Sequence, residues 1–257
     1  YFLMLLVYLS NIFLDVQSGL PRQGPGCADA TRRALALCVG LPDRPRVLDV
    51  GCGPGMQTMV LAQELDGQIT AVDLYEEYLE QLKARVAAAG VMDRIEVLAG
   101  DMNDLALPEH HFDLIWAEGS AYNMGFANAL EAWKPLLKPG GYLAATELVW
   151  LAPAPERPAE AVAFWDGEYP AMTDVQTVAS MFRDRGYKLA GHFTLPDTAW
   201  WDDYYAPLAD KLPMLRQKYR DDDEALGVVE MTQREIEMRR KFGDSYGYEF
   251  FVGRRGG

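Results

Sequence analysis

The stretch that decides the fold is VLDVGCGPG, residues 47–55, in which an apolar run breaks into three glycines spaced two apart. A helical pattern over residues 56–65 follows it. Strand, glycines and helix in this order are typical of a nucleotide-binding turn, because glycine permits positive φ and lets a ligand lie against the main chain. An ordinary strand-to-helix turn is the alternative interpretation of this stretch.

The glycine spacing distinguishes between kinds of nucleotide. A dinucleotide fingerprint starting at Gly51 would need a glycine where Met56 stands, and the third glycine comes early, at Gly55. A phosphate-binding loop is excluded as well, because Gln57 stands near the required lysine and no lysine follows. The remaining pattern, D-x-G-x-G-x-G with Asp49 at its head, suits a ligand with an amino group better than one with a pyrophosphate.

Composition and charge restrict the class of protein. The 257 residues are 49% hydrophobic, which suits one large α/β domain or a domain with an elaborated cap. With 38 acidic and 24 basic residues, the net charge of -14 argues against nucleic acid and against a membrane surface as partners. Three cysteines without C-x-x-C spacing favour a reduced, cytoplasmic protein and predict no metal site.

The opening YFLMLLVYLSNIFL, residues 1–14, is almost uninterruptedly apolar. It is shorter than the roughly 17 to 25 residues of a membrane-spanning helix. It also lacks the basic region and cleavage site of a signal peptide. We expect a buried or amphipathic helix laid over the domain, with membrane insertion as a minor alternative.

Apolar strand patterns alternate with helical ones along the rest of the chain. Seven strands are predicted, at 45–52, 67–75, 94–101, 112–119, 142–150, 187–196 and 246–254. Strands that are nearly continuous in apolar residues and alternate with helices indicate a parallel sheet buried on both faces. Two stretches interrupt the alternation, 151–170 and 197–245, and there we expect a substrate cap.

Acidic residues end consecutive predicted strands. Asp73 stands 22 positions after Gly51, where a ribose-binding carboxylate belongs, and Asp101 is placed to accept from an adenine amino group. Each of them alone could be a helix cap. Together with Asp49 they lie on the carboxyl edge of a parallel sheet, where such sheets bind ligands.

These motifs together resemble those of the class I S-adenosylmethionine-dependent methyltransferases. The matching motifs are VLDVGCGPG (47–55), AVDLY (71–75), AGDMNDL (99–105) and LKPGGYL (137–143), and the last two strands match the antiparallel pair of that family. RQGPG (22–26), GMQTMVLA (55–62) and AEGSAYNMGF (117–126) further resemble a subgroup of bacterial small-molecule methyltransferases. The resemblance implies a doubly wound, Rossmann-like α/β fold with a seven-stranded, mostly parallel sheet, an antiparallel last strand and a helical cap. Separately, the apolar opening joined by the hinge Gly24-Pro25-Gly26 suits a closing element, so we expect a lid segment at 1–26 that orders on cofactor binding, followed by a methyltransferase domain at 27–257.

The resemblance further implies a cofactor, S-adenosylmethionine, and the residues that bind it. The implied contacts are the backbone of Gly51, Gly53 and Gly55 on the methionine moiety, Asp49 near its ammonium, Asp73 and Leu74 at the ribose, Asp101 and Met102 at the adenine, and Gln23 closing over the methionine end.

A small-molecule acceptor is expected beside the cofactor. Tyr122 and Asn123 follow the fourth strand, Trp150 ends the fifth, and Trp200 lies in the second insertion, although an aromatic cluster is more often core than cage. Glu118 is the expected catalytic residue, because a carboxylate at the carboxyl end of a strand faces the crevice; it would orient the acceptor or take its proton. The acidic crevice favours a small, neutral or cationic acceptor, such as an amine.

Two other functions remain open at this point. One is a module that binds S-adenosylmethionine without catalysis. The other is a nicotinamide-dependent oxidoreductase, which the early third glycine and the missing Tyr-x-x-x-Lys pair disfavour. The sequence leaves the acceptor atom and the oligomeric state open.

Overall fold

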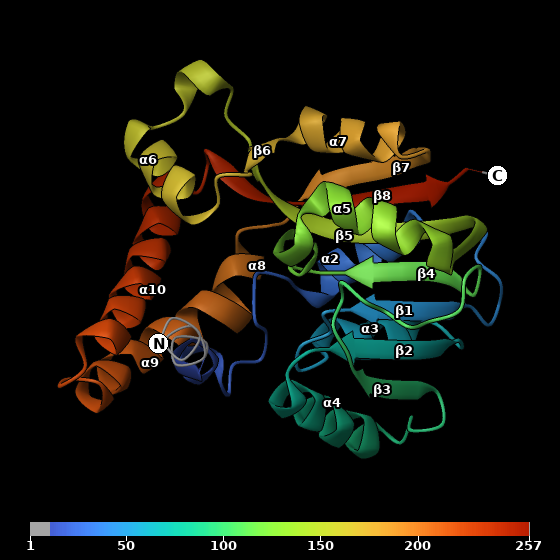
Figure 1. Ribbon diagram of the computed structural model, residues 1–257, viewed down its shortest axis with the longest axis horizontal. Helices are drawn as coiled ribbons and strands as arrows, with labels where there is room; N and C mark the ends of the chain where they lie inside the picture. The colour runs from blue at the N-terminus through green and yellow to red at the C-terminus, as the bar shows by residue number, and fades with distance from the viewer. Residues whose placement is uncertain (1–10, 257) are drawn as a thin grey trace.

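One sheet with helices on both faces carries the fold in the computed structural model, which describes residues 11–256 (Figure 1). The strand order is β3-β2-β1-β4-β5-β8-β7, and β6 pairs with β5. The strands are β1 (Arg46–Val50), β2 (Gln68–Asp73), β3 (Ile95–Ala99), β4 (Phe112–Ala117), β5 (Leu137–Trp150), β6 (Thr173–Asp174), β7 (Tyr187–Thr194) and β8 (Tyr246–Arg255).

The strand directions confirm the predicted fold class. The strands β1 to β5 pair in parallel with their neighbours, whereas β8 runs antiparallel to both β5 and β7. The seven predicted strands are all present, and the two-residue β6 adds an eighth beside the end of β5.

Helices cover the two faces of the sheet and enclose two separate cores. The helices are α2 (Ala28–Ala36), α3 (Met56–Glu64), α4 (Glu76–Ala89), η1 (Ala121–Met124), α5 (Phe126–Trp133), η2 (Lys134–Leu136), η3 (Ala154–Glu156), α6 (Ala159–Glu168), α7 (Val175–Asp184), α8 (Thr198–Trp200), η4 (Trp201–Tyr205), α9 (Ala206–Lys218) and α10 (Asp223–Phe242). Val47 of β1 packs with α2, α3 and α4, whereas Leu48 packs on the opposite face with α5 and α7. Because successive side chains of a strand alternate between faces, a strand covered on both sides is apolar throughout.

A third core lies beyond the carboxyl ends of the strands and forms the cap. Figure 1 shows α9 and α10 on the side toward which β1, β2 and β4 point. Side chains from α6, α9, α10 and η4 pack there with the ends of β5 and β8. Ile12, Val16 and Leu20, from the segment before α2, are buried in the same core.

The segment before α2 is helical over residues 11–17. Most of the apolar opening, residues 1–10, lies outside the described residues. Within the described part of the chain, no helix is both long enough and apolar enough to cross a membrane.

Candidate active site

The glycine turn after β1 adopts the left-handed backbone that its sequence requires. Gly51, Gly53 and Gly55 have φ values of 71°, 53° and 87°. A Cβ on Gly51 would lie 2.4 Å from the Cβ of Ser120, and one on Gly55 would lie 2.2 Å from the side chain of Leu82. A side chain at position 55 would therefore collide with α4. The sequence alone had explained this glycine by the approach of a ligand.

A cavity of about 260 Å³ opens at the carboxyl edge of the sheet, beside this turn. It brings together side chains from the ends of β2 and β4, the loop after β3 and the segment before α2. Of the residues expected at the site, those that line it are Gln23, Gly51, Gly53, Asp73, Leu74, Asp101, Met102, Glu118, Tyr122 and Asn123. Asp49, Gly55, Trp150 and Trp200 are not among the lining residues.

Asp73, at the end of β2, is held by main-chain donors. Its carboxylate accepts from the N–H groups of Gly53, at 2.8 Å, and Tyr75, at 3.0 Å. Burial raises the pKa of Asp73 above its usual range, against the lowering effect of these hydrogen bonds. A carboxylate has about four acceptor positions, so two more donors, such as two ribose hydroxyls, can still be accommodated.

Asp101 follows β3, the strand beside β2, and is exposed. Its Oδ1 accepts from the main-chain and side-chain nitrogens of Asn103, and these hydrogen bonds lower the pKa of Asp101. The main-chain oxygen of Met102 accepts from the indole nitrogen of Trp133 at 3.2 Å. The loop that follows β3 is therefore fixed in place at the edge of the cavity.

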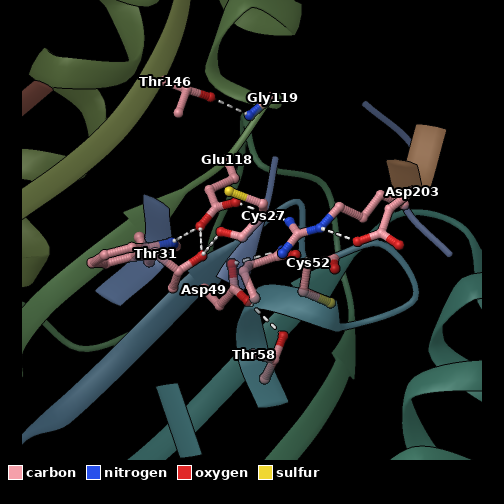
Figure 2. Close-up of polar contacts among 12 residues, drawn as sticks. Cys27, Thr31, Asp49, Cys52, Thr58, Glu118, Gly119, Thr146 and Asp203 are labelled. Atoms are coloured by element: carbon pink, nitrogen blue, oxygen red, sulfur yellow. Dashed lines mark hydrogen bonds and ion pairs between the residues drawn. The ribbon is translucent and has the colours of Figure 1, made fainter. Parts of the chain in front are cut away.

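Asp49 lies behind the cavity wall. It is fully buried on the α3 face of β1, where it accepts from Thr58 Oγ1 at 2.6 Å and from Gln57 Nε2 at 3.5 Å (Figure 2). Burial raises the pKa of Asp49 to about 7, and the negative charges of Glu118 and Asp73 add to the effect. Gln57 lines the cavity. Gln57 thus lies between Asp49 and the cavity, and the expected place of Asp49 near the ammonium of the cofactor stays a prediction.

Glu118, just beyond β4, has three hydrogen-bond donors. Its Oε1 accepts from Thr31 Oγ1 at 2.6 Å and from Trp116 Nε1 at 2.9 Å, and its Oε2 accepts from Arg22 Nη1 at 3.0 Å (Figure 2). The side chain is only 3% exposed. Both carboxylate oxygens are thus engaged by donors of the protein, and the catalytic role expected for Glu118 stays a prediction.

Arg22 is a site residue that the sequence analysis missed. Its guanidinium is 5% exposed, pairs with Glu118 and lies 4.0 Å from Asp203 of η4. A Cβ at Gly26 would come within 2.7 Å of Arg22 Nη1 and 2.9 Å of Glu118 Oε2, which explains the glycine there. The signal was present in RQGPG, because an arginine directly precedes the glutamine that was singled out.

Polar groups complete the cavity near the end of β4. Ser120, which was also missed, lines the cavity and donates to the main-chain oxygen of Val50 at 2.6 Å. Asn123 donates to the main-chain oxygen of Ser120. Gln23 donates to the main chain of Gln17, while its buried Oε1 has no partner among the described residues and is free to accept from a ligand.

Trp150 and Trp200 belong to the third core, which corrects the expectation that they face the acceptor. They are 4% and 1% exposed. The Trp200 ring contacts Tyr205, at a centroid distance of 5.7 Å, and the Arg239 guanidinium lies 4.1 Å from its centroid. These large side chains fill the space between the cap and the ends of β5 and β8.

Residues 11–256 contain no group of three or more His, Cys, Asp or Glu side chains that could hold a metal ion.

Comparison with known proteins connects this site to a family. Residues 47–141 match the family model described as a methyltransferase domain. The 27-O-demethylrifamycin SV methyltransferase of Amycolatopsis mediterranei is 32% identical over 131 residues, which are 49% of this chain and 48% of that protein. Methyltransferase GfsG of Streptomyces halstedii is 31% identical over 105 residues, which are 40% of this chain and 38% of that protein. The chain thus spans about half or less of the length of these relatives.

Solved structures share the fold over almost the whole chain. An S-adenosylmethionine-dependent methyltransferase from Geobacter sulfurreducens, in complex with S-adenosyl-L-homocysteine, has a TM-score of 0.78 at 20% identity and covers 95% of this chain and 97% of its own. A similar complex from Thiobacillus denitrificans has a TM-score of 0.77 at 21% identity, with coverages of 94% and 97%. Residues 47–141 thus match a methyltransferase-domain family, and the chain has the fold of S-adenosylmethionine-dependent methyltransferases of known structure.

Proposed function

We propose that this chain transfers a methyl group from S-adenosylmethionine to a small-molecule acceptor. One observation carries the proposal: a single cavity brings together the glycine turn, Asp73 and Asp101, which follow three adjacent parallel strands. The carboxyl edge of such a sheet is where α/β folds bind their ligands.

The lining residues fit the cofactor. Gly53 offers bare backbone to the cavity, and Asp73 has unused acceptor positions for ribose hydroxyls. The buried, unpartnered Oε1 of Gln23 can accept from an ammonium group. When bound, S-adenosylmethionine supplies an electrophilic methyl group on a sulfonium centre. The protein then has to align the acceptor and exclude water.

Residues 11–26 provide that exclusion. Arg22, Gln23, Gly24 and Pro25 line the cavity. The ion pair between Arg22 and Glu118 holds this segment against the end of β4. Glu118 therefore acts in the proposal as the anchor of a closing segment, within the domain organisation that the sequence suggested, with cap insertions at 151–170 and 197–245.

The acceptor is proposed to be neutral or cationic, because a chain of net charge -14 with acidic residues around the cavity repels multiply charged anions. An amine is the first candidate on this ground. A hydroxyl is the second, since one similar protein is named for methylation of an oxygen.

A methyl-transfer screen tests the proposal. Labelled S-adenosylmethionine is offered with amines, alcohols, phenols, thiols and carboxylates, and the formation of S-adenosylhomocysteine is measured. We expect micromolar-range cofactor binding by calorimetry, together with transfer to an amine or a hydroxyl. Cofactor binding without transfer to any acceptor class would instead support the non-catalytic module, and NADH binding without S-adenosylmethionine binding would support the oxidoreductase.

A further inference from the structure

A second buried carboxylate, Glu147, lies at the carboxyl edge of the sheet. It is on β5, two residues past Ala145, and Ala145 pairs with Ala117, the last residue of β4. Side chains at 143, 145, 147 and 149 share the α5 and α7 face of the sheet. Glu147 therefore stands where β4 has already ended, on the opposite face from Glu118.

Glu147 has an unused carboxylate oxygen. The side chain is 3% exposed, and its Oε1 accepts from the phenol of Tyr169 at 2.5 Å. Its Oε2 is buried and has no hydrogen-bond partner among the described residues. A buried carboxylate that lacks its complement of donors is costly, and such sites are often found where function requires them.

A chain of side chains connects this carboxylate to the cavity. Tyr122 lines the cavity next to Asn123 and Glu118. Its ring meets the ring of Tyr169 edge to face, with centroids 5.9 Å apart, and the phenol of Tyr169 reaches Glu147. Two tyrosines, Tyr122 and Tyr169, thus connect the cavity wall to the buried carboxylate of Glu147.

We propose that Tyr122 marks the methyl-acceptor subsite and that Tyr169 and Glu147 accept the proton that the acceptor loses. The acceptor molecule accordingly carries a proton on its attacking hydroxyl or amine. This inference rests on the proposed methyl transfer and adds a role that the fold alone does not give. Glu118 suits the same role less well, because its two oxygens already accept from three donors.

In the proposed step, the acceptor atom forms a bond to the methyl carbon, and the bond from that carbon to sulfur breaks with its electron pair on sulfur. Because Tyr122, and not Tyr169, lines the cavity, the acceptor proton passes to the hydroxyl oxygen of Tyr122, the phenol proton of Tyr122 passes to Tyr169, and the phenol proton of Tyr169 passes to Glu147. The proton later leaves to solvent, which restores the ionised carboxylate.

The surroundings of Glu147 suit a group that takes up a proton near neutral pH. Burial raises the pKa of Glu147 to about 8, with the hydrogen bond from Tyr169 as an opposing effect. The titratable neighbours of Glu147 are Tyr122, Tyr169, Tyr248 and Glu249. Glu249 lies on β8, directly opposite Glu147 on β5. In residues 11–256, no lysine or arginine forms an ion pair with Glu147.

Glu249 offers a matched control. It lies directly opposite Glu147 in the strand register and is equally buried, at 3%. Both of its oxygens have partners, His192 at 2.5 Å and Thr194 at 2.6 Å. Glu249→Gln therefore perturbs the neighbouring buried carboxylate while it leaves the side chains of Tyr122, Tyr169 and Glu147 in place.

The test compares Glu147→Gln, Tyr169→Phe and Glu249→Gln in the full chain with the best acceptor from the screen. Loss of a general base lowers turnover by about 10² to 10⁴-fold, so we expect this range for Glu147→Gln and a marked loss for Tyr169→Phe. S-Adenosylhomocysteine affinity should be unchanged in both. Turnover of the wild type on a hydroxyl acceptor should rise with pH through about 8, the pKa of Glu147, and this limb should vanish in Glu147→Gln. With an amine acceptor, a limb at the pKa of the amine itself should remain.

A second readout does not depend on turnover. The protein without cofactor should show an infrared carbonyl band of a protonated carboxylic acid with a component that titrates at about 8, above the pKa of about 7 of Asp49, and Glu147→Gln should lose this component while Glu249→Gln keeps it. If the wild type methylates an acceptor and Glu147→Gln retains its rate and its pH limb, the subsite is wrong although methyl transfer stands. If the wild type methylates nothing, the proposed function fails and this inference fails with it.

Discussion

Arg22 and Glu118 lie 96 residues apart in the chain and form an ion pair of 3.0 Å in which both side chains are almost completely buried. The pair joins the segment before α2 to the end of β4. The same guanidinium lies 4.0 Å from Asp203 in the cap. One side chain therefore links two parts of the cavity wall to each other and lies close to the cap.

Removing one partner of this ion pair should destabilise the fold more than replacing both charged side chains by neutral ones. Arg22→Ala leaves a buried carboxylate without its cation, which costs about 3 to 5 kcal/mol when the remaining charge stays buried. The double variant Arg22→Met/Glu118→Gln removes both charges and should recover much of that loss. Urea unfolding of the single and double variants measures the difference. Equal stability of Arg22→Ala and the wild type would mean that the pair is not formed in solution.

Asp73 should decide cofactor affinity. Asp73→Ala removes up to two charge-assisted hydrogen bonds to ribose, so binding of S-adenosylhomocysteine should weaken by about 1.5 to 3 kcal/mol. Asp104→Asn is the control, because Asp104 is exposed and is not among the cavity-lining residues. Calorimetry that showed the same loss for both variants would indicate a general charge effect in place of a ribose contact.

Cofactor binding should release a proton near neutral pH. The pKa of Asp49 is raised to about 7 in the free protein, and a bound ammonium would favour its ionised form and lower that pKa. Affinity should therefore rise with pH up to about 7 and level off above it. Calorimetry in buffers of different ionisation enthalpy measures the proton release, and Asp49→Asn should abolish it.

The same carboxyl should influence the pH dependence of folding. The ordinary pKa of Asp49 is 3.8, and its folded value is about 7, so between these values the folded chain binds more protons than the unfolded chain. The contribution of Asp49 to the free energy of unfolding therefore falls as pH rises from about 4 to about 7. In Asp49→Asn, this part of the pH dependence should be absent.

Removing residues 1–20 should loosen the cavity and spare the sheet. Three buried apolar residues in the described part of that range pack in the core of the cap and not in the two cores of the sheet. They are Ile12, Val16 and Leu20. We expect faster dissociation of S-adenosylhomocysteine, with unchanged strand content by circular dichroism. Lys211→Met, which loses the hydrogen bonds from Lys211 Nζ to the main chain of residues 15, 16 and 18, should give an intermediate effect. A truncated chain with normal binding and turnover would assign another role to this segment.

The sheet could be predicted from the sequence because its determinants are local. A strand covered on both faces has to be apolar at nearly every position, and a glycine turn with positive φ has to lie where β1 passes into α3. Asp73 and Asp101 follow from their place at strand ends, and the structure brings both to the cavity. These features need no knowledge of which distant residue lies beside them.

Tertiary structure decided the partners of buried groups. The sequence by itself placed Glu118 at the carboxyl edge, but only the fold brought Arg22 and Thr31 to it as hydrogen-bond donors. Aromatic residues were ambiguous for a similar reason, since a tryptophan such as Trp200 suits a core as well as a binding wall. Periodicity reports whether a side chain is buried. Which long-range donor, ring or carboxylate meets it there depends on how distant segments pack, and that is why Glu147 and Tyr169 became visible only in three dimensions.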